Sequence, residues 1–406
     1  MAKQNKPAIR FKGFTDAWEQ RKLGEVVKEV TRNDPTSEAP IMMITANNGF
    51  IEQSERYAFD NAGESLKKYI LLQKGELAYN HGASKLRPFG SCFALTTAES
   101  ARIPFVYHCF SAENQNAEFL SIELNGSEVE SQLRKIVSSG ARMDGLLNIS
   151  FDEYSTVTVL LPDIKEQEHI ADFFRNLDHL ITLHQRKYDK LQVLKKAMLE
   201  KMFPKNGSSV PEIRFKGFTD AWEQRKLGDN IVEYTEVTTE NNQYPPLTSS
   251  RKGIFLQTEY FAGNQIASDD NTGYNIVPYG YFTYRHMSDD EVFHFNINDI
   301  VEKGIVSTLY PVFTTDENLD SRYLQYQLNY GHEFAKFAIL QKQGGSRTYM
   351  YLNKLRQLHL TMPNHVEEQK AISSFFMNLD HLITLHQREL EKLQNIKKSM
   401  LEKMFV

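Results

Sequence analysis

One segment of this chain occurs twice. The sixteen residues IRFKGFTDAWEQRKLG stand at Ile9–Gly24 and again, unchanged, at Ile213–Gly228. Two shorter segments repeat in the same order, which are LDHLITLHQR at Leu177–Arg186 and Leu379–Arg388, and MLEKMF at Met198–Phe203 and Met400–Phe405. The 406-residue chain therefore consists of two units in tandem, each with a repeated beginning, a divergent middle and a repeated end.

The two copies meet at PKNGSSVPE, Pro204–Glu212, whose Pro, Gly and Ser residues favour an exposed, irregular linker. Pro162 and Pro363 precede the repeated ends, at the place where a proline is expected before a helix. The predicted division is a globular domain at 1–163, a helix at 164–203, the linker at 204–212, a second globular domain at 213–364 and a C-terminal helix at 365–406.

Each repeated end is predicted to be one long helix, because apolar residues recur at steps of three and four and no Pro or Gly interrupts them. A helix of about 38 residues is roughly 57 Å long. So long and narrow an apolar stripe favours pairing with the other copy, and the alternative is that each helix packs only on its own globular domain. The predicted pairing positions are Ile170, Leu177, Leu180, His184, Leu191 and Leu194 in the first copy, and Ile372, Leu379, Leu382, His386, Leu393 and Ile396 in the second.

The divergent middles mix short β-rich runs with Gly and Asn turns, which predicts α+β domains. They keep common landmarks. KGELAYN at Lys74–Asn80 corresponds to YGYFTYR at Tyr279–Arg285, and SGARMDGLLN at Ser139–Asn148 corresponds to GGSRTYMYLN at Gly344–Asn353. The sequence therefore predicts one fold used twice with different surfaces.

The sequence does not contain the common catalytic motifs, namely a G-x-G-x-x-G or Walker loop, H-E-x-x-H and G-x-S-x-G. QYPPL at Gln243–Leu247 is similar to the N-P-P-Y motif of amino-methyltransferases, but its Asn and Tyr are misplaced, so a proline turn is favoured. Cys92 and Cys109 are too few for a cysteine-rich zinc site. We expect a chain that is not an enzyme and binds neither metal nor cofactor.

The formal charge of −5 and the pI of about 6.2 argue against a stand-alone nucleic-acid binder, which is usually basic. No run approaches the roughly 18 apolar residues of a membrane span, so the chain is expected to have no membrane partner and to be cytoplasmic.

Surface recognition is the remaining class of function. Several polar loops carry Arg and Lys, which pair with guanine edges or phosphates, and Asn, which pairs with adenine. Solvated turns have the same composition, so each loop alone is a weak signal. The candidate DNA-contacting residues are Asn80, His81, Ser84, Lys85, Arg87, Arg142, Ser250, Arg251, Lys252, Arg285, His286, Ser346 and Arg347.

The whole layout resembles the specificity (S) subunits of type I restriction-modification systems. The resemblance rests on FKGFTDAWEQRKLG at the start of each half, KGELAYN in the first, LPDIKEQEHIADFF and MPNHVEEQKAISSFF before the helices, and LEKMF at their ends. It implies that the divergent middles are two target recognition domains, each reading one half of a split double-stranded DNA site. It also implies that the two conserved helices pair as an antiparallel coiled coil, which makes the internal repeat a pseudo-two-fold one.

The resemblance further implies the partners. Two methyltransferase (M) subunits would dock on the helices and bind S-adenosylmethionine, and restriction (R) subunits would use ATP and Mg²⁺. Two identical M subunits need two equivalent docking surfaces, which explains why the beginnings and ends of the two halves repeat while the two recognition domains differ. Two alternatives remain open, which are a coiled-coil interaction scaffold without DNA specificity and a methyltransferase with an unrecognised motif.

Overall fold

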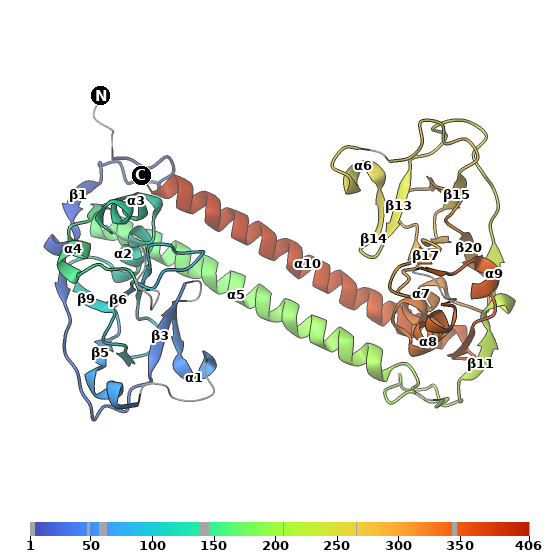
Figure 1. The fold of residues 1–406 in the computed structure, drawn as a ribbon, viewed down its shortest axis with the longest axis horizontal. Coiled ribbons are helices and arrows are strands. Elements are labelled where there is room, and N and C mark those ends of the chain that lie inside the picture. The colour runs from blue at the N-terminus through green and yellow to red at the C-terminus, as the bar shows by residue number, and fades with distance from the viewer. Residues whose placement is uncertain are drawn as a thin grey trace. The chain divides into compact units, whose positions relative to one another are not determined.

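The computed structural model describes residues 5–46, 49–56, 63–137, 146–205, 207–264, 266–342 and 347–405. They form two compact units, of which the first is Met1–Gln185 with Arg388–Val406 and the second is Arg186–Gln387. The units do not follow the predicted domain boundaries, because each includes one half of both long helices. The N- and C-terminal parts of the chain thus belong to the same unit (Figure 1).

The first unit is built on a four-stranded antiparallel sheet in the order β2-β9-β6-β7. Its strands are β2 (Val27–Glu29), β6 (Leu77–Asn80), β7 (Ser91–Ala94) and β9 (His108–Ala112). Three antiparallel pairs flank it, formed by β1 (Glu19–Lys22) with β10 (Thr158–Leu161), β3 (Met42–Thr45) with β4 (Gly49–Glu52), and β5 (Ile70–Gln73) with β8 (Ser100–Ile103). The shorter helices are η1 (Leu23–Glu25), α1 (Gln53–Arg56), η2 (Gly63–Lys68), α2 (Ala117–Leu124), α3 (Ser127–Ile136) and α4 (Phe151–Ser155).

The second unit repeats this topology with a four-stranded sheet in the order β12-β20-β16-β18. Its strands are β12 (Ile231–Glu233), β16 (Phe282–Thr283), β18 (Asn296–Ile297) and β20 (Val312–Thr315). The pairs are β11 (Glu223–Lys226) with β22 (His359–Met362), β13 (Leu247–Ser250) with β14 (Gly253–Leu256), β15 (Asn275–Pro278) with β19 (Lys303–Val306), and β17 (Met287–Ser288) with β21 (Thr348–Tyr349). The shorter helices are η3 (Leu227–Asp229), α6 (Gln257–Tyr260), α7 (Ser321–Tyr330), α8 (His332–Leu340) and α9 (Leu352–Leu355).

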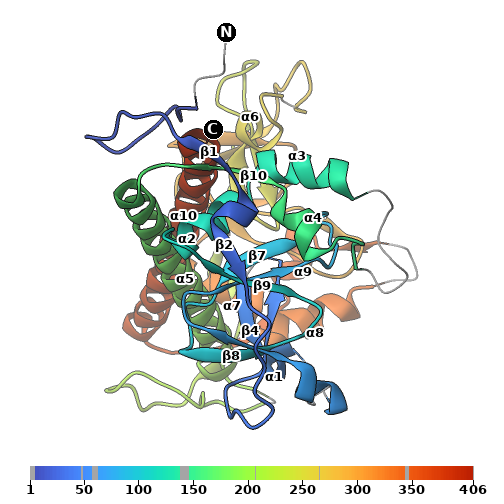
Figure 2. The same ribbon diagram turned by 90° about the vertical axis from the view of Figure 1, so that its left-hand side faces the viewer.

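The two long helices are α5 (Ile164–Lys201) and α10 (Val366–Met404), which confirms the two predicted helices to within a few residues. In the first unit, Ile170 and Phe174 of α5 share a buried cluster with Met404, and Lys397 forms an ion pair with Asp178 at 2.5 Å. Residue numbers rise along α5 as they fall along α10, so the helices are antiparallel within this unit. Figure 2, in which the first unit faces the viewer, shows α2 beside both helices.

The second unit contains the matching helix pair. Phe203, the residue that ends the first MLEKMF, lies in one buried cluster with Ile372 and Phe376 of α10. Lys195 pairs with Asp380 at 2.5 Å, just as Lys397 pairs with Asp178. Within each unit, therefore, the end of one long helix packs beside the beginning of the other.

The predicted pairing positions differ in how far they are buried. Ile170, Leu177, Ile372 and Leu379 are buried, and His184, Leu191, His386, Leu393 and Ile396 are partly buried. Leu180, Leu382 and Leu194 are 43%, 40% and 39% exposed. The buried position next to Leu382 is Ile383, a displacement of one residue. Leu180, followed by the partly buried Ile181, shows the same displacement.

The repeated beginnings are fixed to the long helices by buried ion pairs. Arg10 donates from Nε and Nη2 to the carboxylate of Glu166 at 2.8 and 2.6 Å, and Arg214 makes the same paired contact with Glu368 at 2.6 and 2.7 Å. Both glutamate side chains are only 1% exposed. This bidentate geometry compensates the burial of the charges and explains why the same letters recur in both halves.

The glutamine after each of these glutamates positions the globular core. Gln167 Oε1 accepts a hydrogen bond from the backbone N–H of Asn116 at 3.0 Å, and Gln369 Oε1 accepts one from Asp320 at 2.8 Å. Asn116 and Asp320 are the N-caps of α2 and α7, and side-chain caps of this kind stabilise a helix start. The repeated sequence is therefore a frame that holds two divergent cores.

Neither long helix, nor any other helix of the described segments, is long and apolar enough to cross a membrane.

Candidate nucleic-acid interface

In the first unit the candidate residues surround the loop from Gly82 to Gly90, which joins β6 to β7. Asn80 anchors its beginning, because its Nδ2 donates to the carbonyl oxygen of Ile44 at 3.1 Å and its Oδ1 accepts from the N–H of Gly82 at 2.9 Å. Gly90 closes the loop at a φ of +82°, and a Cβ there would lie 2.6 Å from the backbone carbonyl oxygen of Asn80. The loop therefore leaves the sheet with a fixed geometry.

Ser84 and Arg87 shape the tip of this loop. The backbone N–H of Ser84 donates to the carbonyl oxygen of Arg87 at 3.0 Å, and the Ser84 Oγ accepts a hydrogen bond from the N–H of Arg87 at 3.0 Å. The Arg87 guanidinium turns inward, where Nη1 donates to the carbonyl oxygen of Asn125 at 2.8 Å and burial lowers its pKa. Lys85 remains exposed beside Leu86. Ser84 and Lys85 are therefore the candidates that the tip presents to solvent.

His81 and His286 are buried, contrary to the expectation of surface contact. The two ring nitrogens of His81 lie 2.8 Å from the carbonyl oxygen of Leu147 and 2.7 Å from that of Val106. The His286 ring stacks on Tyr351 at 5.2 Å between centroids. Each histidine lies two residues after a buried tyrosine, Tyr79 in β6 and Tyr284 directly after β16, so both lie in the domain interior.

In the second unit, two candidate arginines are held by neighbouring aspartates. Arg251, at the turn between β13 and β14, makes a paired contact with Asp290, and Arg347 Nε donates to Asp289 Oδ1 at 2.9 Å. Hydrogen bonds from Arg251 and from the Ser288 hydroxyl hold the pKa of the Asp290 carboxyl well below its usual range. The structure thus gathers two guanidinium groups, widely separated in sequence, beside one acidic pair.

The other candidates of the second unit have simpler surroundings. Ser250 Oγ donates to the carbonyl oxygen of Gly253 at 3.1 Å and accepts from the N–H of Lys252, so it shapes the same turn. The side chains of Lys252 and Arg285 are exposed. Arg142 and Ser346 lie outside the described residues.

Two exposed tyrosines beside Arg347 were not predicted as site residues. The rings of Tyr349 and Tyr351 are 6.0 Å apart and nearly parallel, at 10°. Aromatic faces of this kind are platforms on which bases stack. Their spacing of two along an extended segment was the available sequence signal, since alternate residues of a strand point to the same side.

No group of three or more His, Cys, Asp or Glu side chains that could hold a metal ion occurs within the described segments. The two cysteines are buried thiols, and burial raises the pKa of both. The Lys, Arg, Ser and Tyr side chains described above can form hydrogen bonds, ion pairs and stacking contacts.

Residues 220–395 match the family described as the type I restriction modification DNA specificity domain. The chain is similar to the type I restriction enzyme MjaVIII specificity subunit of Methanocaldococcus jannaschii, with 23% identity over 316 residues that cover 70% of this chain and 67% of that one. It is also similar to the putative MjaX specificity subunit of that organism, with 22% identity over 95% of this chain and 92% of the other.

A solved structure supports the fold along the full length. The S subunit of a type I restriction-modification system from M. genitalium shares it with a TM-score of 0.56 at 12% sequence identity, over 99% of each chain. The family match and the two relatives support a specificity subunit of a type I restriction-modification system, and the solved structure supports the fold.

Proposed function

We propose that this chain is the non-catalytic subunit that recognises the DNA sequence in a type I restriction-modification complex, and that each unit reads one half of a bipartite target. The observation that carries the proposal is the contrast between frame and surface. The ion pairs Arg10–Glu166 and Arg214–Glu368 are the same in both units, while the side chains offered around the sheet differ. A duplicated frame with two different reading surfaces suits a split, asymmetric DNA site.

The reading surfaces are proposed to be the loop tip of Ser84 and Lys85 in the first unit and the cluster of Arg251, Arg347 and Tyr349 in the second. Lysine and arginine can contact phosphates and guanine edges, and tyrosine can stack on a base or pack against a sugar. The arginines already hydrogen-bond carboxylates, so a DNA phosphate or base edge would replace Asp289 and Asp290 as their partner. The net charge of −5 suggests that partner subunits supply much of the phosphate contact.

The proposed partners are two M subunits, which bind S-adenosylmethionine, and R subunits, which use ATP and Mg²⁺. Identical apolar side chains support two equivalent docking surfaces on the long helices. Leu180 and Leu183 of α5 are exposed, and so are their counterparts Leu382 and Leu385 of α10. Exposed apolar side chains at matching positions of a repeat favour contact with two copies of one partner.

The central test is selection from a random duplex DNA pool by the chain co-purified with its M subunit, at a stated salt concentration. We expect two short motifs at a constant spacing. The variant Lys85→Ala should weaken only one motif, and Arg251→Ala only the other. Failure to enrich any motif with the M subunit bound would favour the interaction-scaffold alternative, and loss of both motifs in either variant would contradict separate reading.

We also propose that the paired helices fix the spacing between the half-sites. Seven residues, about two helical turns, inserted after Leu191 and after the matching Leu393 would keep the side-chain register of the pair. The same selection should then return unchanged motifs with a longer spacing. An unchanged spacing would argue against this role of the helices.

A further inference from the structure

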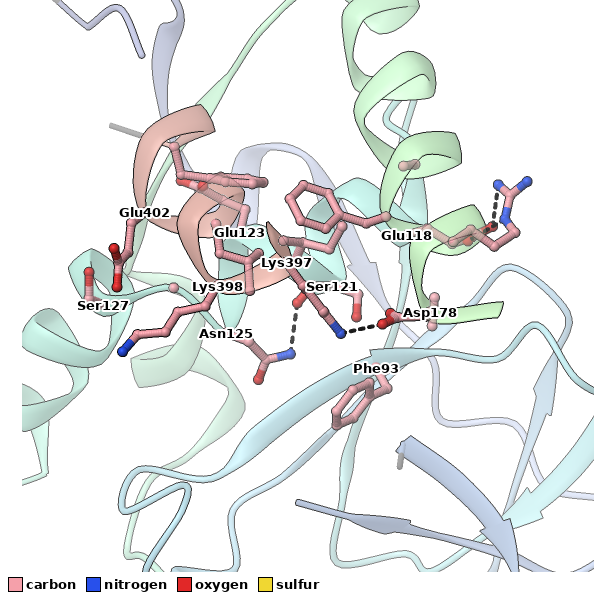
Figure 3. Close-up of a pocket in the computed structure, with 18 of the residues that line it drawn as sticks. Phe93, Glu118, Ser121, Glu123, Asn125, Ser127, Asp178, Lys397, Lys398 and Glu402 are labelled. Atoms are coloured by element: carbon pink, nitrogen blue, oxygen red, sulfur yellow. Dashed lines mark hydrogen bonds and ion pairs between the residues drawn. The ribbon is translucent and has the colours of Figure 1, made fainter. Parts of the chain in front are cut away.

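The first unit contains a hollow of about 760 Å³ that the proposed DNA-reading function does not use. It lies between α2, α5 and the last turns of α10, and its lining includes Ser121, Glu123, Phe174, Asp178, Lys397 and Phe405. Figure 3 shows Lys397 and Asp178 joined at one side of the hollow, with Ser121 and Glu123 labelled among the side chains that line it. Its volume is in the range of small-molecule binding pockets.

The second unit shows why this space is empty in the first. Asn125 at the end of α2 accepts from the N–H of Cys92 and donates to its carbonyl oxygen, and Asn329 makes the same two contacts with Phe295. Ile122 precedes Asn125 by as many residues as Tyr326 precedes Asn329, so Ile122 occupies in the first unit the place of Tyr326 in the second. The chain then continues from Asn125 directly to the glycine that begins α3, whereas Tyr330 is inserted before the glycine that begins α8.

Tyr326 and Tyr330 fill the equivalent space. The Tyr326 hydroxyl donates to Asp380 Oδ2 at 2.7 Å, and its ring centroid lies 5.1 Å from that of Phe376. Lys195 Nζ lies 5.8 Å from the Tyr326 ring centroid and 4.9 Å from that of Tyr330. The side chain of Lys195 is consequently only 14% exposed.

The groups that hold the Tyr326 ring recur in the first unit. Asp178, Phe174 and Lys397 stand at the positions of Asp380, Phe376 and Lys195 in the repeated helices. Asp178 and Lys397 form the same ion pair at 2.5 Å. Lys397 is 34% exposed, however, because Ile122 carries no ring to cover it.

We propose that the hollow of the first unit binds a small molecule that carries a phenol-type ring. Its hydroxyl donates to the Asp178 carboxylate, and its ring packs on Phe174 within reach of Lys397, as Tyr326 does in the second unit. A hydroxyl–carboxylate hydrogen bond, a ring–ring contact and a cation–π contact are each favourable in a partly desolvated site. The remaining volume, lined by Ser121 and Glu123, accommodates polar substituents on the ring. This inference does not depend on DNA recognition.

The test uses p-cresol, the side-chain analogue of tyrosine, with the full chain. Saturation-transfer NMR and titration should show saturable binding, with p-cresol about tenfold tighter than toluene because toluene lacks the hydroxyl. Ile122→Tyr should refill the hollow and weaken p-cresol binding at least tenfold. The exposed control Ile339→Tyr, on α8 of the second unit, should leave it unchanged. No saturable signal, or equal binding by Ile122→Tyr and the unaltered chain, would overturn the proposal.

Two further variants keep the test decisive if Ile122→Tyr fails to fold. Asp178→Asn should reduce the preference for p-cresol over toluene to less than threefold, since the charged acceptor is lost. Tyr326→Ala should open the matching space in the second unit and raise the number of p-cresol molecules bound from one to two. An unchanged preference in the first variant, or unchanged stoichiometry in the second, would show that the repeated Asp, Lys and Phe do not bind such a ring.

Discussion

The backbone N–H of Ile9 donates to the carbonyl oxygen of Lys403 at 2.9 Å, which ties the beginning of the chain to its end inside the first unit. The second unit has the same hydrogen bond between Ile213 and Lys201, at 3.0 Å. There the intervening residues are the linker, whereas in the first unit they are the two chain ends. Ile9 and Lys403 therefore occupy in the first unit the places that Ile213 and Lys201, which flank the linker, occupy in the second.

We accordingly expect a circular permutant to fold. A copy of PKNGSSVPE would join Phe405 to Ile9, and new termini would open the original linker at 204–212. The described contacts of both cores would be kept except those made by residues 5–8 and by the opened linker, such as the hydrogen bond from the Trp222 N–H to the carbonyl oxygen of Ser209. The melting temperature should therefore change by only a few degrees, and the selected DNA motifs should be the same. A permutant opened inside the buried central strand β6 is the control and should not fold. Failure of both permutants in thermal unfolding would contradict the equivalence of termini and linker.

The long helices could be predicted because their apolar period and lack of Pro and Gly are local properties. The position of the pairing stripe could not. The repeated LDHLITLHQR offers Leu180 and Ile181 as neighbouring apolar residues, and steps of three or four are both compatible with a helical stripe. Packing against the partner helix decides between them, and that information is not local.

The candidate site was harder to predict than the helices for two physical reasons. A polar residue in a Gly-rich segment suggests a surface, yet His81 is buried, with its two ring nitrogens 2.8 and 2.7 Å from backbone carbonyl oxygens. The hollow near Ile122 was invisible because the middles diverge in sequence. The equivalence of Ile122 and Tyr326 appears only when the hydrogen bonds of Asn125 and Asn329 are compared.

The buried ion pairs of the frame should be important for stability. Arg10→Met would leave the Glu166 carboxylate buried without its partner, which is expected to cost about 3 kcal/mol or more in the free energy of unfolding. Arg214→Met should have the same effect on the second unit. The control Arg21→Met removes an exposed pair with Glu25 and should lower the free energy of unfolding far less, because water and salt screen an exposed pair. Urea unfolding measures all three, and equal losses for Arg10→Met and Arg21→Met would show that the frame does not depend on the buried pair.

Glu123 should make stability depend on pH. Burial raises the pKa of its carboxyl from 4.5 to about 7, so the folded chain binds more protons than the unfolded chain between these values. Stability should therefore fall as the pH rises from about 4.5 to 7, with the penalty fully present above 7. Glu123→Gln, which places the residue of Gln327 in the first unit, should gain up to about 3 kcal/mol at pH 8 and almost nothing near pH 4.5. A gain that is independent of pH would contradict this origin.

Asp289 and Asp290 should restrain non-specific DNA binding by the second unit. Asp289 pairs with Arg347 and Asp290 pairs with Arg251, and each arginine must leave its carboxylate before it can contact a phosphate. Replacing both with Asn should increase affinity for unrelated duplex DNA several-fold. It should also steepen the dependence of log K on log salt by about 1 for each phosphate newly contacted.

Asp220→Asn combined with Glu223→Gln is a matched control, because it removes two carboxylates from a different part of the same unit, where they pair with His365 and Arg225. Its effect on the salt slope should be much smaller. Binding would be measured by fluorescence anisotropy between 50 and 200 mM salt, the range over which the counterion-release slope is usually resolved. If the double variant and the control changed the slope equally, the acidic pair would be acting only through net charge, and Arg251 and Arg347 would not lie at the DNA.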